Sequence, residues 1–196
     1  MSEPENERRQ RFDGLFVEYG ADIVAYCGWR AASASDAQDA VADVFLTAWR
    51  RLDDVPADPM SARVWLYATA RRMLANQRRS NGRRSALHDR LAHEAVSALR
   101  DRPTTGEESL VHDALELLAP LDREVLLLSE WEDLSAAEIA SVVGCLTVTA
   151  RGRLHRARRR FRAAFEDLRD RDVRRAAVAR RSAGAPDYSL LRQGGS

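Results

Sequence analysis

The sequence predicts an all-helical protein with two small helical domains joined by a flexible linker. Apolar residues recur at steps of three and four through most of the 196 residues, the spacing of one buried helix face. Only 6 prolines interrupt the chain, so long helices can form. The periodicity is lost in one stretch that contains Pro103 and Gly106. We therefore expect four segments: a first domain over 11–84, a linker over 85–108, a second domain over 109–168 and a partly helical, mobile tail over 169–196.

The first domain is predicted to begin with two helices. Residues Arg11 to Arg30 place apolar side chains on one face at steps of three and four, among them Phe16. Ser35 and Gln38 match a capping box, in which each side chain satisfies a free backbone amide, and the helix that follows continues to Leu52. The small residues between these helices predict a short connection.

A third helix completes the first domain. Two prolines and three aspartates between Asp53 and Met60 indicate a loop. Ser61 is the expected N-cap of a helix from Ala62 to about Arg79, whose apolar residues again follow helical steps. These helices can close on one another as a three- or four-helix bundle.

The second domain is predicted to contain four helices. The first stops at Pro120 and the second opens at Asp122, with Trp131 on its buried side. Ser135 and Glu138 match a capping box that opens a short third helix, and a left-handed glycine should end that helix at Gly144. Thr147 can cap a long fourth helix that runs to Leu168. A short helix, a glycine turn and a longer helix together form the helix-turn-helix arrangement.

The charge is near zero in total and strongly divided along the chain. The net charge is +1 and every basic residue is arginine. Seven arginines and no carboxylate lie between Ser61 and His88, and seven more lie in the carboxylate-free segment between Thr147 and Ala164. An ordinary solvated helix alternates its charges, so this pattern favours DNA binding over an ordinary helical bundle.

The remaining composition excludes several other classes of protein. Cys27 and Cys145 do not form a metal-binding or redox pair, and the four histidines lack ligand spacing, so no metal, cofactor or catalytic residue is expected. No apolar run reaches the roughly 20 residues that span a membrane. The charged N-terminal residues do not form a signal peptide, so we expect a cytoplasmic protein without membrane insertion.

Three stretches resemble the extracytoplasmic-function (ECF) subfamily of the sigma-70 family of RNA polymerase sigma factors. The stretch from Asp36 to Leu52 is similar to the polymerase-binding helix of region two. The stretch from Trp65 to Arg79 resembles the helix of region two that melts the promoter and recognises its minus-ten element. The stretch from Leu121 to Arg158 contains segments that resemble region four. The order and the spacing of all three agree with the family.

The resemblance implies a sigma factor that binds core RNA polymerase and directs initiation at specific promoters. Region two would bind polymerase through Asp39, Asp43, Phe45 and Trp49, although Phe45 and Trp49 are as easily core residues. The minus-ten DNA would be bound by Trp65, Tyr67, Arg71, Arg72, Asn76 and Arg79, with Trp65 more readily a core residue. Unpaired bases need planar partners and the backbone needs cations, which these residue types supply.

Region four would read the minus-thirty-five element in the major groove. The candidates for this contact are Thr149, Arg151, Arg153 and Arg156, and Arg158, Arg159 and Arg160 would contact phosphate. The resemblance also implies an anti-sigma factor as a further partner. A stand-alone helix-turn-helix regulator remains an alternative, although it would not need the second basic helix. A nuclease would need a metal-binding set of carboxylates, and the acidic residues show no such pattern.

Overall fold

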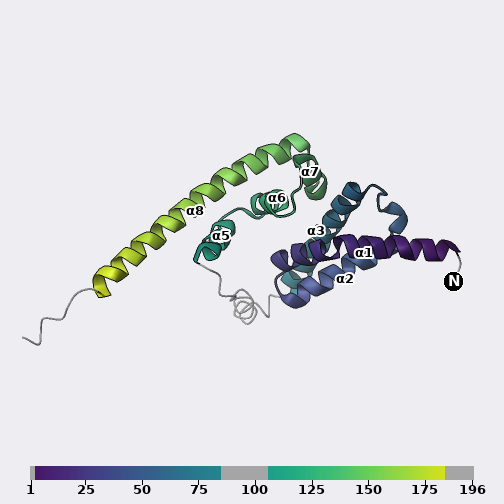
Figure 1. Cartoon of the computed structure of the whole chain (residues 1–196), viewed down its shortest axis with the longest axis horizontal. Helices are drawn as coiled ribbons and strands as arrows, with labels where there is room; N and C mark the ends of the chain where they lie inside the picture. The colour runs from purple at the N-terminus through teal and green to yellow at the C-terminus, as the bar shows by residue number, and fades with distance from the viewer. Residues whose placement is uncertain (1–2, 85–105, 184–196) are drawn as a thin grey trace, which may run out of the picture.

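The computed structural model describes residues 3–84 and 106–183 and places them in seven α-helices and one short 3-10 helix. The all-helical fold is therefore confirmed. The helices form two groups, one on each side of the gap between the described ranges (Figure 1). Most of the predicted linker lies outside the described residues, and its last three residues already belong to the first helix of the second group.

The first group is a bundle of α1 (Glu3–Arg30), α2 (Ala34–Arg50) and α3 (Pro59–Arg84), with the 3-10 helix η1 (Leu52–Asp54) between α2 and α3. Its core is built from apolar side chains at helical spacing, so the predicted faces are largely those that pack together. Helix α1 begins eight residues before the predicted Arg11. Arg8 and Arg11 fix this part of α1, since their Nη2 atoms donate to the carbonyls of Trp49 at 2.8 Å and Val55 at 2.5 Å.

Two predicted helix caps of this bundle were wrong. Ser33 rather than Ser35 caps α2, and its hydroxyl accepts a hydrogen bond from the amide of Asp36 at 3.1 Å. Helix α3 begins at Pro59, and the carboxylate of Asp58 accepts from the amide of Ser61 at 2.8 Å. In both cases a capping side chain lies earlier than the predicted one, and a proline is well tolerated in the first turn of a helix because it lacks an amide hydrogen.

The second group contains α5 (Gly106–Glu116), α6 (Pro120–Glu130), α7 (Ala136–Val143) and α8 (Thr147–Ala183). Pro120 is the first residue of α6 rather than a breaker after α5, so Asp122 lies in the first turn instead of opening the helix. Trp131 was expected on the buried side of this helix and is 51% exposed. It lies just past the last turn of α6, where the helical phase no longer sets its direction.

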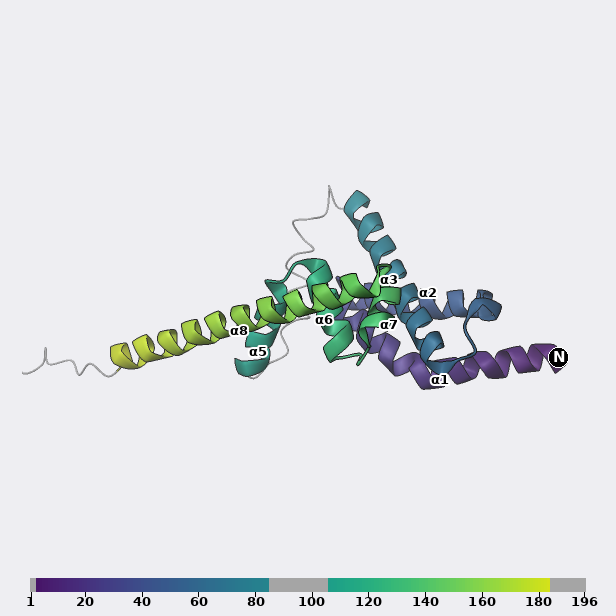
Figure 2. The same ribbon diagram turned by 90° about the horizontal axis from the view of Figure 1, so that it is seen from above.

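Helix α8 is the longest described helix, and Figures 1 and 2 show it running beyond α5 at one end of the molecule. It extends past the predicted end at Leu168, and residues 169–183 of the tail, which was expected to be partly helical, continue this helix. The two groups are in contact, because α3 packs against α7 as well as against its own bundle. Both views place these two helices side by side at the centre of the molecule (Figures 1 and 2).

Candidate functional site

The outward face of α2 carries two carboxylates. Asp39 and Asp43 are exposed and lie one turn apart, and Leu46 follows on the same face with 44% of its surface exposed. A strip of two acids and an exposed leucine offers both charge and apolar area to another macromolecule. Leu46 was missed in the sequence, because an apolar residue in an amphipathic helix is ordinarily assigned to the core.

Phe45 lies beneath this surface, and Trp49 lies at its edge. Phe45 is 6% exposed, and its ring packs against the rings of Phe12 at 6.3 Å and Phe16 at 4.8 Å. Trp49 is half-buried between the ring of Phe12 at 5.3 Å and the guanidinium of Arg8 at 5.5 Å. Phe45 is thus a core residue that holds α2 on α1, and Trp49 exposes only part of its ring.

Helix α3 presents a polar stripe with an aromatic residue at its N-terminal end. Trp65 is half-buried, whereas Arg72, Asn76 and Arg79 are exposed and follow at helical steps on the same side. Arg79 donates to the side-chain oxygen of Asn76. Arg72 donates to the carbonyl of Ala68 at 3.2 Å, so the stripe is ordered by uncharged acceptors and keeps its positive charge.

Two of the predicted DNA-binding residues of α3 lie away from this stripe. Arg71 is half-buried, and Tyr67 is completely buried. The Tyr67 hydroxyl donates to Oε2 of Glu132, which lies between α6 and α7, at 2.7 Å. Burial raises the pKa of Tyr67 well above its usual range, and the hydrogen bond to Glu132 adds to this effect. In this arrangement Tyr67 is part of the contact between the two groups of helices.

The helix-turn-helix of α7 and α8 is built largely as its sequence predicts, although Thr147 is the first residue of α8 rather than its cap, and Leu146 accepts the first helical hydrogen bond from the amide of Ala150. The Ser135 hydroxyl and the Glu138 carboxylate form a reciprocal capping box, which fixes the start of α7. Gly144 ends α7 in the left-handed conformation with φ 75°, which a glycine adopts without steric cost. Residues Leu146 and Val148 are each 72% exposed at the turn and at the start of α8.

The six arginines of α8 that were predicted to contact DNA divide into two sets. Arg153 and Arg160 both donate to the buried carboxylate of Asp122 on α6, at 3.1 Å for Arg153, and Arg158 forms an ion pair with Glu130 at 2.7 Å. Within residues 3–84 and 106–183, no carboxylate pairs with the members of the second set, which are Arg151, Arg156 and Arg159. The second set and Thr149 are exposed.

The charge-pairing carboxylates could not be found in the sequence alone. Asp122 and Glu130 lie 31 and 28 residues from the arginines that they contact, Arg153 and Arg158. Only the packing of α6 on α8 brings them together. The signal that was available is the burial pattern of α6, which places Asp122 one turn before the apolar residues Val125 and Leu126.

The described part of the chain offers neither a metal-binding cluster nor a membrane-spanning helix. No group of three or more histidine, cysteine or acidic side chains there could hold a metal ion. No helix in the described ranges is long and apolar enough to cross a membrane.

Family models match both groups of helices. Residues 15–84 match "Sigma-70 region 2", and residues 109–161 match "Sigma-70, region 4". The chain is 30% identical over 162 residues to the ECF RNA polymerase sigma factor SigL of Mycobacterium tuberculosis, covering 79% of this chain and 88% of the relative. It is also 30% identical to the RNA polymerase sigma-H factor of Pseudomonas aeruginosa, covering 82% of this chain and 89% of that protein.

Solved structures share the fold. The sigma factor RpoE of Bartonella quintana, solved with the anti-sigma factor NepR, matches with a TM-score of 0.64 at 21% identity, covering 79% of this chain and 96% of that one. CnrH, solved with the cytosolic domain of CnrY, matches with a TM-score of 0.58 at 24% identity, covering 80% and 88%.

The helix-turn-helix of α7 and α8 is thus the DNA-binding part of region 4, and the bundle of α1 to α3 is region 2. A stand-alone regulator is no longer needed as an explanation, because the sigma-specific bundle accompanies the helix-turn-helix in the same chain. The chain belongs to the ECF RNA polymerase sigma factors of the sigma-70 family, which bind core RNA polymerase and direct transcription initiation at promoters.

Proposed function

We propose a division of labour in which α2 binds core polymerase, α3 holds the melted minus-ten strand and the start of α8 reads the minus-thirty-five duplex. The observation that supports it most is the presence of two exposed arginine stripes on helices of separate regions, together with an acidic strip on a third helix. Positive charge favours contact with DNA phosphates, and negative charge suits a basic protein surface.

Polymerase would be bound mainly through Asp39 and Asp43, with Leu46 added to the predicted set. Exposure of all three residues supports this assignment. Phe45 acts by holding α2 in place, and Trp49 contributes at the edge of the same surface. Association would therefore combine salt-sensitive attraction with a small apolar contact.

The minus-ten strand would follow the stripe of Trp65, Arg72, Asn76 and Arg79 on α3. Asn76 can hydrogen-bond to a base edge, and the arginines can contact the backbone or stack on bases. Arg71 is less accessible. Tyr67 lies on another side of α3 and is buried against region 4, so it is left out of this set. Strand opening then needs no bond cleavage, because binding of the separated strand supplies the free energy.

The minus-thirty-five element would be read by Thr149, Arg151 and Arg156, with Arg159 on phosphate. Arg153, Arg158 and Arg160 have carboxylate partners on α6, and DNA would compete with those partners for them. Bidentate contact of arginine with guanine is the commonest specific contact in the major groove. We further propose a cytoplasmic location and control by an anti-sigma factor, the kind of partner named for the related fold of Bartonella RpoE.

Run-off transcription with core polymerase over a fragment library of the native genome tests this assignment. We expect specific transcripts that require the chain, and we expect the double charge reversal Asp39→Arg/Asp43→Arg to abolish them. The matched control is Asp170→Arg/Asp172→Arg, which reverses two exposed carboxylates far along α8. Normal polymerase binding by the α2 variant would contradict the assignment of α2, and absence of any chain-dependent transcript would contradict the whole proposal.

A further inference from the structure

Regions 2 and 4 are held together by a buried arginine. Arg30 is the last residue of α1, and its guanidinium donates through Nε to Oε2 of Glu124 on α6 at 2.9 Å. Its Nη1 lies 3.6 Å from Oε1 of Glu132, also in region 4. The guanidinium stacks on the ring of Tyr26 at 3.7 Å. One cation from region 2 thus meets two carboxylates from region 4.

Two tyrosines of region 2 complete this network. The Tyr26 hydroxyl donates to Oε1 of Glu124 at 2.6 Å, and the Tyr67 hydroxyl donates to Oε2 of Glu132 at 2.7 Å. The two tyrosine rings also lie against each other, with their centroids 5.2 Å apart. Each glutamate is therefore bound by Arg30 and by one tyrosine, so neither carboxylate is buried without partners.

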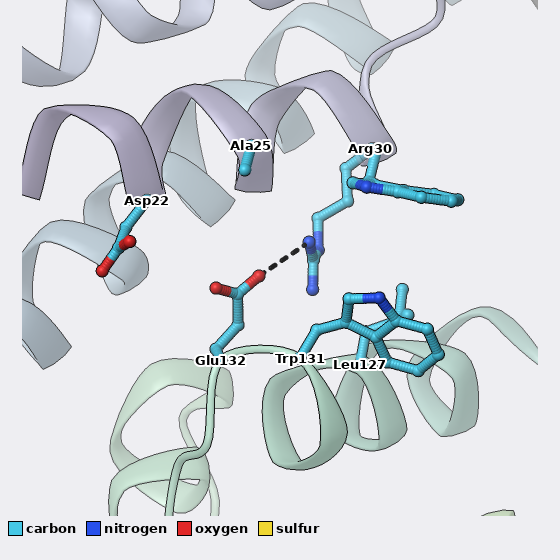
Figure 3. A pocket seen from close by; sticks show the side chains of 7 residues that line it. Asp22, Ala25, Arg30, Leu127, Trp131 and Glu132 are labelled. Atoms are coloured by element: carbon cyan, nitrogen blue, oxygen red, sulfur yellow. Dashed lines mark ion pairs between the residues drawn. The ribbon is translucent and has the colours of Figure 1, made fainter.

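The network has a specific geometry, but its hydrogen bonds and ion pairs can be replaced by contacts with water at little cost in free energy. A buried ion pair loses most of its Coulomb energy to desolvation, so its opening into solvent costs little when all its members become hydrated. Nη2 of Arg30 has no hydrogen-bond partner among the described residues, which weakens the closed arrangement further. A cleft of about 140 Å³ lies beside the ion pair, lined in part by Arg30, Leu127, Trp131 and Glu132 (Figure 3).

The closed arrangement conflicts with promoter binding. It buries Tyr67 and packs α3 against α7, the first helix of the DNA-binding motif. The minus-ten and minus-thirty-five elements lie about 25 base pairs apart, which is about 85 Å along a duplex that rises 3.4 Å per base pair. Two modules in direct contact cannot occupy both elements of one duplex.

We propose that Arg30, Tyr26, Tyr67, Glu124 and Glu132 form a latch through which the free sigma factor inhibits itself. The latch keeps the minus-ten and minus-thirty-five modules together until binding to core polymerase separates them. Inhibition by this device needs no second protein. The proposal rests on the division of labour proposed above, since the latch matters only if both modules bind one promoter.

The test compares three variants of the full chain in small-angle X-ray scattering. Glu124→Gln/Glu132→Gln leaves Arg30 as an unpaired buried cation, and Arg30→Gln leaves two unpaired carboxylates, so we expect both variants to open and to show a larger radius of gyration than the parent. The triple variant replaces every charge by an amide and should close again. Glu116→Gln/Asp167→Asn is the matched control, because it removes the same charge from ion pairs that lie entirely within the second group of helices, and it should stay closed.

Binding to core polymerase provides the functional measurement. If about one parent molecule in ten is open, each opened variant should bind core about tenfold more tightly, and the triple variant should return towards the parent. Far-ultraviolet circular dichroism checks that each variant keeps its helices. If the Glu124/Glu132 variant loses helix, the test relies on Arg30→Gln, which breaks the same ion pairs from region 2.

The two outcomes of failure are distinct. Equal dimensions and equal core affinity of the parent and the opened variants would overturn the latch while leaving the sigma activity intact. A triple variant that stays as open as the others would also overturn it, because opening would not then depend on unpaired charge. If the parent chain itself supported no specific transcription with core polymerase, the proposed division of labour would be overturned instead.

Discussion

Helices α3 and α8 each carry a run of arginines without a carboxylate, but their arginines meet different partners. On α8, carboxylates of α6 bind Arg153, Arg158 and Arg160. On α3, Arg63 lies 3.5 Å from the carboxylate of Asp22, but Arg72 and Arg78 donate to backbone carbonyls, and the donation from Arg78 to the carbonyl of Arg30 measures 2.6 Å. A positive field therefore covers much of α3, whereas on α8 it is concentrated on fewer side chains.

This difference suits the two kinds of DNA that the regions are proposed to bind. A duplex presents base edges at fixed positions, so a reading helix gains from a few ordered side chains and from a rigid attachment to its domain. A single strand is pliable and is held by backbone charge and stacking, so an extended cationic stripe is adequate. The carboxylates of α6 thus both anchor α8 and restrict which arginines are available.

Asp122→Ala should have the largest effect, because it removes the anchor that distinguishes α8 from α3. Asp122 is 3% exposed and binds two arginines. We expect the free energy of unfolding of region 4 to fall by about 2–3 kcal/mol, less than the loss of a fully buried pair because both arginines can reach water. Urea denaturation measures this, and Asp122→Asn should lose less, since the amide still accepts hydrogen bonds. A change below about 0.5 kcal/mol would mean that the ion pairs do not anchor α8.

Arg151→Ala and Arg159→Ala should distinguish recognition of a base from electrostatic attraction to phosphate on α8. Loss of Arg151 should cost about 1–3 kcal/mol of binding free energy at one base position of the minus-thirty-five element. Loss of Arg159 should weaken binding to all sequences alike and lower the salt dependence. Binding measured on promoter fragments with single base changes, at several salt concentrations, checks both. A uniform loss from both variants would show that neither arginine reads a base.

Much of the fold could be predicted from the sequence because it is encoded locally. The capping box at Ser135 and Glu138 and the left-handed glycine at Gly144 depend on neighbours within a few residues, and both were confirmed. The misplaced caps of α2 and α3 show the limit of this reasoning, since several small polar residues near a helix start compete for the same amides.

The partners of the arginines could not be predicted from the sequence, for a different reason. Asp122 with Arg160, and Tyr67 with Glu132, are separated by 38 and 65 residues and meet only through tertiary packing. Helical periodicity gives the buried face of each helix but not which polar groups on two faces will meet. Tyr67 therefore stood among the DNA-binding candidates of α3, although its side chain is buried against region 4.

Gly144→Ala should show that the entry to α8 depends on a backbone conformation. At φ 75° a side chain costs about 1–2 kcal/mol, although no other atom lies within 4 Å of the added methyl group. Gly152→Ala, inside α8, should instead stabilise region 4 by about 0.5–1 kcal/mol, because alanine loses less conformational entropy in a helix. The Arg156 side chain is 3.4 Å from that methyl group and is flexible enough to move. Thermal unfolding of both variants compares the two, and equal effects would contradict this account.

Asp58→Ala should have the smallest effect, and its pH dependence should identify the entry to α3 as a charged cap. The hydrogen bond from the amide of Ser61 lowers the pKa of Asp58 below its usual value of 3.8. A carboxyl group with a lowered pKa in the folded state stabilises the fold fully above its unfolded pKa, and the contribution disappears as the pH falls through the folded value. The loss of stability in Asp58→Ala should therefore be constant near neutral pH and should shrink below about pH 4.

Ser33→Ala is the control for this pH dependence. The Ser33 hydroxyl caps α2 through the amide of Asp36 and does not titrate, so its loss should cost about 1 kcal/mol at every pH at which region 2 is folded. Unfolding of the two variants and the parent, measured side by side between pH 3 and about pH 7, separates the two kinds of cap. If both losses followed the same course with pH, the ionised carboxylate of Asp58 would not be what holds the first turn of α3. The entry to α3 would then rest, like the entry to α8, on uncharged groups alone.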